Sequence, residues 1–187
     1  MIEYFILTMV LLVGSSVLNL MDFSNTWLLL GLIVITLPSI YAALTGAPYE
    51  PSDKNSVKKM IALARLKKGE RAVDLGCGDG RLVRAARKEG AEAVGYEISF
   101  ILYWIARVLN RGAGRIFYQS YWRADVSDAD VIFCYQLPKF EKRFKQIIWP
   151  QLKPGCRVVV NTFALQTLEP VATYGNVYLY IKPWDEG

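Results

Sequence analysis

The chain has 187 residues, with 22 basic and 17 acidic side chains, a net charge of +5 and no histidine. This length accommodates one ordinary domain and an extension. The lack of histidine removes the usual general base near neutral pH and most zinc or iron sites, and the three widely spaced cysteines argue against a disulfide framework. We therefore expect a protein without a metal, in a reducing compartment.

The first 47 residues contain no Lys or Arg, and every basic residue lies at or after Lys54. The two uncharged segments Tyr4–Met21 and Trp27–Leu44 are each long enough to cross a bilayer. We predict that residues 1–47 form a transmembrane helical hairpin. The basic residues after it would place the body on the cytoplasmic face, or on the matrix-like face of an organelle. The alternatives are a cleaved signal peptide, a single spanning segment, or two soluble helices.

Residues 48–187 alternate strand-like and helix-like segments, which is typical of an α/β domain with a doubly wound, mostly parallel sheet. Such a sheet binds its ligands at the carboxyl ends of its strands. In chain order we expect a helix over 54–66, a strand over 71–75, a helix over 81–89, a strand over 93–96, a helix over 100–110, strands over 115–118 and 130–135, a helix over 139–149, a strand over 157–162, and a terminal pair over 168–173 and 177–182.

The segment V-D-L-G-C-G-D-G-R, residues 73–81, joins the first strand of this domain to the next helix. Its glycines allow a tight turn and a close approach of a ligand, and the start of the helix suits an anion. A dinucleotide-binding motif would have its third glycine at position 81, where this chain has arginine. Hydride transfer is therefore the weaker interpretation.

Glu97, at the end of the second strand, is placed to accept hydrogen bonds from ribose hydroxyls. The alternative is a glycine-rich turn without a ligand.

This segment resembles the first motif of the class I methyltransferases, which use S-adenosylmethionine (AdoMet) and have a Rossmann-like sheet. The resemblance implies that the methionine carboxylate lies at the start of the helix and that Asp74 meets the ammonium group. Ser120 and Trp122 would contact the adenine, although Trp122 could equally cover the edge of the core. The expected cofactor-binding residues are Asp74, Gly76, Cys77, Gly78, Gly80, Tyr96, Glu97, Ile98, Ser120 and Trp122.

The fourth strand ends in Y-Q-L-P, residues 135–138, where this fold borders the transferred methyl group. The polar–Pro–aromatic motif of many amino-methylating enzymes is absent here. Tyr135 and Gln136 are the candidate catalytic residues, which would orient an amine, and the alternative is that Tyr135 belongs to the core. Transfer requires alignment of the nucleophile with the methyl group and an amine that has lost its proton to water, to a carboxylate such as Glu50, or to a tyrosine.

Several segments together resemble the membrane-anchored protein-lysine methyltransferases that modify the ATP synthase c subunit and the adenine nucleotide translocase, a family with small prokaryotic relatives. They are P-Y-E-P-S at 48–52, the 73–81 segment, G-A-E-A-V-G-Y-E-I at 90–98, A-D-V-I-F-C-Y-Q-L-P at 129–138 and L-K-P-G-C-R-V-V-V-N-T-F at 152–163. The resemblance implies AdoMet-dependent methylation of a protein lysine. It also implies that Tyr49, Pro51 and Ser52 bind the substrate side of the site. Those relatives are described with one membrane segment, whereas this chain has two candidate segments.

The leading hypothesis is therefore an AdoMet-dependent protein-lysine N-methyltransferase that acts at the bilayer on a protein, itself embedded in the membrane. One alternative is a methyltransferase for an amine lipid or a quinone precursor. A second is an AdoMet-binding scaffold protein without activity. We expect no nucleic-acid partner, because a solvated helix face accounts for the basic residues of segment 139–145.

Overall fold

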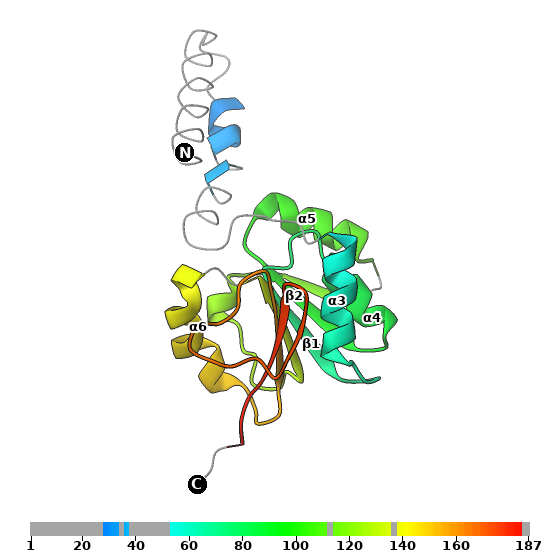
Figure 1. Cartoon of the computed structure of the whole chain (residues 1–187). Coiled ribbons are helices and arrows are strands. Elements are labelled where there is room, and N and C mark those ends of the chain that lie inside the picture. The colour runs from blue at the N-terminus through cyan, green and yellow to red at the C-terminus, as the bar shows by residue number, and fades with distance from the viewer. Residues whose placement is uncertain (1–27, 34–35, 38–52, 112–113, 136–137, 185–187) are drawn as a thin grey trace. The chain divides into compact units, whose positions relative to one another are not determined.

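A computed structural model describes residues 28–33, 36–37, 53–111, 114–135 and 138–184 of the chain (Figure 1). The chain divides into two compact units, Met1–Pro38 and Ser39–Gly187. In the first unit the described residues are helical. Within the described ranges no helix has both the length and the apolar character that a membrane crossing requires. Most of the predicted hairpin over residues 1–47 lies outside these ranges, so the hairpin stays a prediction.

The second unit is built on a seven-stranded sheet with the order β3-β2-β1-β4-β5-β7-β6. The first five strands in this order run parallel, whereas β7 is antiparallel to both β5 and β6. The strands are β1 (Arg71–Leu75), β2 (Glu92–Glu97), β3 (Arg115–Tyr118), β4 (Val131–Tyr135), β5 (Arg157–Asn161), β6 (Ala172–Tyr174) and β7 (Val177–Ile181). The predicted α/β class with a mostly parallel sheet is confirmed.

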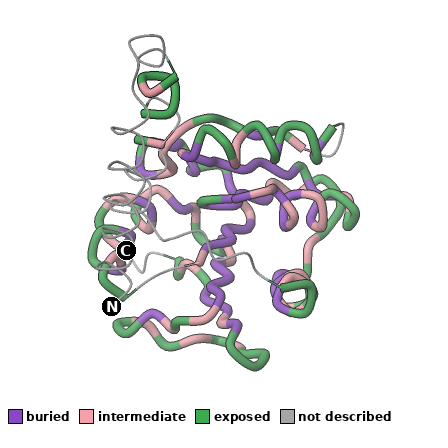
Figure 2. The backbone as a smooth tube through the Cα atoms, turned by 90° about the horizontal axis from the view of Figure 1, so that it is seen from above, coloured by how far each residue is buried: buried purple, intermediate pink, exposed green. Residues whose placement is uncertain are grey.

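Helices cover both faces of this sheet. They are α3 (Lys54–Ala64), α4 (Arg81–Lys88), α5 (Phe100–Leu109) and α6 (Glu141–Ile147), with the short 3-10 helices η2 (Tyr121–Arg123), η3 (Pro138–Phe140) and η4 (Trp149–Gln151). The helices α3 and α4 lie on one side of the strands and α6 on the other (Figure 1). Two apolar clusters form, because alternate residues of each strand point to opposite faces. The buried residues gather along the strands in the interior (Figure 2).

The sequence-based boundaries of most strands hold to within one residue. The strands β1 and β3 match their predicted ranges, and β4 reads V-I-F-C-Y because apolar clusters flank it on both sides. The prediction was wrong at β6, which begins at Ala172 and not at residue 168. The Glu141 carboxylate accepts hydrogen bonds from the backbone N–H groups of Gln166 and Thr167 at 2.8 and 2.9 Å. These bonds hold the segment before β6 against α6.

Arg157, at the start of β5, fixes the end of α3. The helix begins at an Asp53 cap, whose side chain accepts from the Ser56 N–H. It ends at Arg65, which has a left-handed φ of 45°. The Arg157 guanidinium donates to the carbonyl oxygens of Ala64 and Arg65 and to the Glu70 carboxylate. One half-buried cation therefore satisfies the last carbonyls of the helix and a carboxylate of the following turn.

We expect Arg157→Leu to destabilise the protein by about 3 kcal/mol, because two carbonyls lose their side-chain donor and the Glu70 carboxylate loses its cationic partner. Arg157→Lys should recover only part of this loss, since an ammonium lacks the planar set of donors that guanidinium has. Urea unfolding followed by circular dichroism measures both variants. Equal stability of all three proteins would contradict the assigned role.

Candidate functional site

The conformation of the loop between β1 and α4 depends on its glycines. Gly76, Gly78 and Gly80 have φ values of 83°, 55° and 76°, in the left-handed region that favours glycine. At Gly80 a Cβ atom would lie 2.1 Å from the Asn110 Nδ2 atom, so a side chain is excluded there. The backbone N–H groups of Gly76 and Cys77 both donate to the Tyr96 carbonyl oxygen, at 3.0 and 2.9 Å. The loop is thereby fixed to the end of β2.

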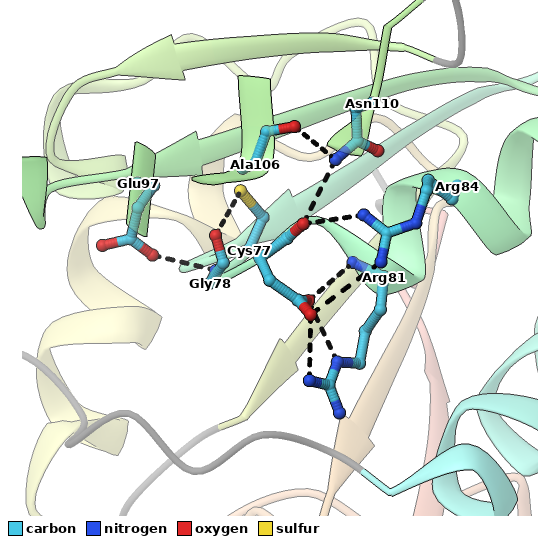
Figure 3. Close-up of polar contacts among 8 residues, drawn as sticks. Cys77, Gly78, Arg81, Arg84, Glu97, Ala106 and Asn110 are labelled. Atoms are coloured by element: carbon cyan, nitrogen blue, oxygen red, sulfur yellow. Dashed lines mark hydrogen bonds and ion pairs between the residues drawn. The ribbon is translucent and has the colours of Figure 1, made fainter. Parts of the chain in front are cut away.

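Glu97 ends β2 and joins the loop to α5. Its Oε2 atom accepts from the Gly78 N–H at 2.9 Å (Figure 3), and Oε1 accepts from the Ser99 N–H at 2.7 Å. Burial raises the pKa of Glu97, although the backbone hydrogen bonds from Ser99 and Gly78 oppose this shift. A carboxylate oxygen can accept more than one hydrogen bond. The side chain can therefore hold the loop and still accept from the two hydroxyls of a ribose.

Asp74 is a second buried acid beside Glu97. Burial, together with the charges of Glu97 and Asp79, raises the pKa of Asp74 from 3.8 to about 8. Two buried carboxyls at the carboxyl ends of β1 and β2 favour a ligand that carries positive charge, because such a ligand stabilises their ionised forms. The ammonium and sulfonium groups of AdoMet meet this requirement. The residues present therefore fit the predicted cofactor.

Asp79 and its arginine partners form the other side of the loop. The Arg81 Nε and Nη2 atoms donate to the Asp79 carboxylate at 3.0 and 2.9 Å, while Arg84 and Asn110 donate to the Asp79 carbonyl oxygen at 2.7 and 3.2 Å (Figure 3). Burial raises the pKa of Asp79, but the hydrogen bonds and charges of Arg81 and Arg84 outweigh this effect and lower it. The arginine at position 81 thus stabilises the loop itself.

Sequence reasoning did not identify Asp79, Asn110 or Tyr121 as part of the site. Asn110 lies 31 residues after Asp79, and no local spacing links the two. Tyr121 lies against the loop, since its Cε1 atom is 3.9 Å from the position of a Cβ on Gly76. Burial raises the pKa of the Tyr121 hydroxyl. The sequence instead suggested the neighbours of Tyr121, which are Ser120 and Trp122. In an irregular segment no repeating pattern of residues indicates which way each side chain points.

Ser120 and Trp122, the two neighbours of Tyr121, take different positions. Ser120 is half-buried and precedes η2. Trp122 is 8% exposed and belongs to the core cluster on the α6 face, with the Arg143 guanidinium 4.5 Å from its ring centre. This packing favours the core role of Trp122 that the sequence left open. Contact of Ser120 or Trp122 with adenine stays a prediction.

The other predicted cofactor residues lie around the end of β2. The Tyr96 ring is buried and stacks on Phe117 with centroids 5.6 Å apart. Burial raises the pKa of the Cys77 thiol, so this side chain packs as a small apolar group. Ile98 is half-buried between Glu97 and Ser99. Their contacts with a cofactor stay predictions.

The predicted acceptor side is only partly described. The Tyr135 ring meets the Phe163 ring edge to face, with centroids 6.0 Å apart, where β4 and β5 end together. The catalytic candidate Gln136 lies outside the described residues, as do the predicted substrate-binding residues Tyr49, Pro51 and Ser52. The role of Tyr135 in orienting an amine stays a prediction.

A strained turn follows β5 at this acceptor side. Thr162 has a φ of 76°, which is a rare conformation for a β-branched residue. The Phe163 N–H donates to the Asn161 carbonyl at 3.0 Å across it, and the Thr162 N–H donates to the Asn176 carbonyl at 2.7 Å. Backbone strain of this kind concentrates at functional sites. The turn orients Phe163 toward Tyr135, a role that the sequence did not indicate although it contains N-T-F.

Comparison with known proteins gives three related findings. Residues 74–172 match the ANTKMT methyltransferase domain. A protein-lysine N-methyltransferase of Saccharolobus islandicus (strain REY15A) is 32% identical over 149 residues, which are 72% of this chain and 92% of the relative. The lysine N-methyltransferase of the ATP synthase c subunit from Xenopus laevis is 29% identical over 172 residues, which are 84% of this chain and 76% of the relative.

A solved structure extends the comparison to the bound cofactor. The crystal structure of an RNA methyltransferase from Salinibacter ruber in complex with S-adenosyl-L-homocysteine has a TM-score of 0.68 and is 31% identical, covering 74% of this chain and 97% of that chain. S-adenosylhomocysteine is what AdoMet becomes after it gives up its methyl group. The similar proteins thus agree on methyl transfer and are named for different acceptors.

The buried carboxyl of Asp74 predicts a specific pH dependence for the ligand-free protein. The folded state binds a proton at Asp74 up to about pH 8, whereas the unfolded chain loses it near 3.8. Between these values the stability of the parent relative to Asp74→Asn should fall as the pH rises, with a slope of about 1.4 kcal/mol per pH unit. Urea unfolding across this range measures the difference. A constant difference between the two proteins would contradict the raised pKa.

The strained turn predicts that Thr162→Gly stabilises the fold by about 1 kcal/mol, because glycine removes the left-handed strain at a smaller entropic cost. Thr173→Gly, in the extended strand β6, is the matched control and should destabilise by about the same amount. Thermal unfolding compares the two. Destabilisation by both changes would show that Thr162 is not strained.

Proposed function

We propose that this chain, which belongs to the family of the ANTKMT methyltransferase domain, methylates the ε-amino group of a lysine in a protein that lies in a membrane. The chain is an AdoMet-dependent methyltransferase. The protein-lysine acceptor is supported by two relatives named for lysine methylation, each covered over three quarters or more of its length. The membrane location of the acceptor is supported by the uncharged segments that precede the domain.

The observation that carries the cofactor side of this proposal is the geometry of Glu97. Its two oxygens hold the Gly78 and Ser99 N–H groups at the carboxyl ends of β1 and β2. The same oxygens retain lone pairs for ribose hydroxyls, and the neighbouring Asp74 carboxyl favours a cationic ligand. Bound AdoMet supplies the methyl group as an electrophile.

The residues of the chain align the acceptor and control its proton. Methyl transfer gains most from holding the nucleophile in line with the methyl group. At the acceptor side the Tyr135 and Phe163 rings provide an apolar wall at the ends of β4 and β5. An apolar surrounding disfavours the charged form of an amine and lowers the pKa of a lysine. The wall would therefore help the lysine to present a free lone pair.

The predicted anchor over residues 1–47 supports action at the bilayer. An anchored enzyme meets membrane proteins at a high effective concentration without any additional contact. An integral chain would remain in the membrane pellet after extraction with alkaline carbonate. Release of the chain into the supernatant would contradict the anchor but leave the methyltransferase assignment intact.

The acceptor is tested by incubating the full chain with isotopically labelled AdoMet and with membranes and RNA from the source cell. Label should appear in protein as methyl-lysine, identified by mass spectrometry after digestion. Label confined to the lipid extract would support the lipid alternative, and label confined to RNA would show that this chain shares the acceptor for which the Salinibacter ruber protein is named. Either result would overturn the protein-lysine proposal.

Glu97→Gln should weaken AdoMet binding about tenfold to hundredfold, because the amide nitrogen cannot accept the hydrogen bonds of the carboxylate. Glu92→Gln is the matched control, since Glu92 is exposed at the start of the same strand. Calorimetry measures the affinity and unfolding confirms that each variant folds. Equal affinities for the two variants would remove Glu97 from the cofactor site.

A further inference from the structure

The helix α5 presents an apolar face to the outside of the domain. The exposed fractions of its outward side chains lie between 41% and 53%, and these residues are Phe100, Ile101, Trp104, Ile105, Val108 and Leu109. Ala106 is the buried residue of this helix. A surface helix normally directs its apolar stripe to the core and its polar residues to water. Here a continuous apolar stripe points away from the sheet.

Aromatic rings extend this face over the edge strand β3. Phe100 contacts Tyr118 with ring centroids 5.9 Å apart, and Tyr103 contacts Tyr118 at 5.3 Å. Phe100 also meets the Trp104 ring at 6.2 Å. Tyr118 is 48% exposed at the edge of the sheet. Tryptophan and tyrosine are enriched where one end of a ring meets apolar chains and the other meets water, as at a membrane surface.

Three arginines lie beside the carboxyl end of this face. A shallow depression of about 380 Å³ is lined by Arg107, Asn110, Arg111, Gly114, Arg115, Ile116 and Phe117. Its described lining contains three cationic side chains and no acid. Arginine pairs well with phosphate, because its planar guanidinium donates in a fixed geometry. The depression is thus complementary in charge to an anionic group at the rim of an apolar surface.

We propose that the outer face of α5 and the arginine depression rest on the surface of a bilayer that contains anionic lipids. Ten residues are too few to cross a membrane, so the helix would lie in the plane of the interface. Its apolar side chains then reach the acyl chains, while Arg107, Arg111 and Arg115 meet lipid phosphates. Each arginine near an anionic surface strengthens such binding about fivefold.

This surface adjoins the cofactor site. The helix α5 begins at Phe100, directly after Ser99, whose N–H donates to Glu97. A bilayer under α5 would therefore lie next to the end of β2. The inference goes beyond the proposed function and does not depend on which acceptor receives the methyl group.

The test uses the full chain reconstituted in lipid nanodiscs made of equal parts phosphatidylcholine and phosphatidylglycerol. An environment-sensitive fluorophore is attached at Ile105→Cys on α5, or at Gln146→Cys, an exposed position on α6, as the matched control. The native cysteines are buried, which directs the label to the new thiol. Doxyl-labelled lipid reports contact with acyl chains, and aqueous iodide reports contact with water.

The proposal expects doxyl lipid to quench the label at 105 severalfold more than the label at 146, and iodide to show the reverse order. Replacing Arg107, Arg111 and Arg115 with glutamine, or using phosphatidylcholine alone, should lower the doxyl quenching at 105. Protection from iodide without doxyl quenching would mean that protein covers the face and would overturn the proposal. Equal iodide quenching at both positions would also overturn it. AdoMet binding by calorimetry confirms folding, and Val108→Cys replaces Ile105→Cys if that variant fails to fold.

Discussion

The Glu97 carboxylate holds three parts of the chain in one place. Its two oxygens accept from Gly78 in the glycine loop and from Ser99 at the start of α5, while its own backbone ends β2. Hydrogen bonds to a charged acceptor contribute about 1.5–3 kcal/mol each, more than neutral ones. The position of the loop relative to the sheet therefore depends on one buried side chain, which must stay at the carboxyl end of its strand.

This arrangement concentrates negative charge where the fold can least solvate it. Burial raises the pKa of both Asp74 and Glu97, and the charge of Glu97 adds to the shift at Asp74. Asp79 is less buried, and its arginine partners lower its pKa. The loop thus carries one acid that is paired with arginines, and it lies beside two acids that are poorly solvated. A cationic cofactor offsets the cost of ionising these buried carboxyls. The site therefore favours a positively charged ligand over a neutral or negative one.

The sequence predicted the parts of this structure that follow from a period or from a special backbone conformation. Alternating apolar strands indicated the sheet, and the glycines at 76, 78 and 80 indicated the loop, whose left-handed φ values the structure confirms. Contacts between distant segments could not be predicted. Asn110 reaches the Asp79 carbonyl across 31 residues, and Glu141 accepts from the backbone of Gln166 and Thr167 across 25 and 26 residues. Thr162 was equally hidden, because its residue type favours a strand and only the tertiary structure forces its turn.

The sequence of α5 likewise predicted the helix but not its contacts, and these contacts connect the helix to the site. A pattern of apolar residues at helical spacing predicts a helix but does not say which face meets the core. In this fold the small Ala106 lies against the sheet, Tyr103 packs partly against the same cluster, and six larger apolar residues remain exposed. The Ser99 N–H at the start of this helix donates to Glu97. A force that repositions α5 therefore acts on the carboxylate that holds the glycine loop. Asn110, which follows the last residue of α5, donates to the Asp79 carbonyl of the same loop, so α5 is tied to the glycine loop at both of its ends.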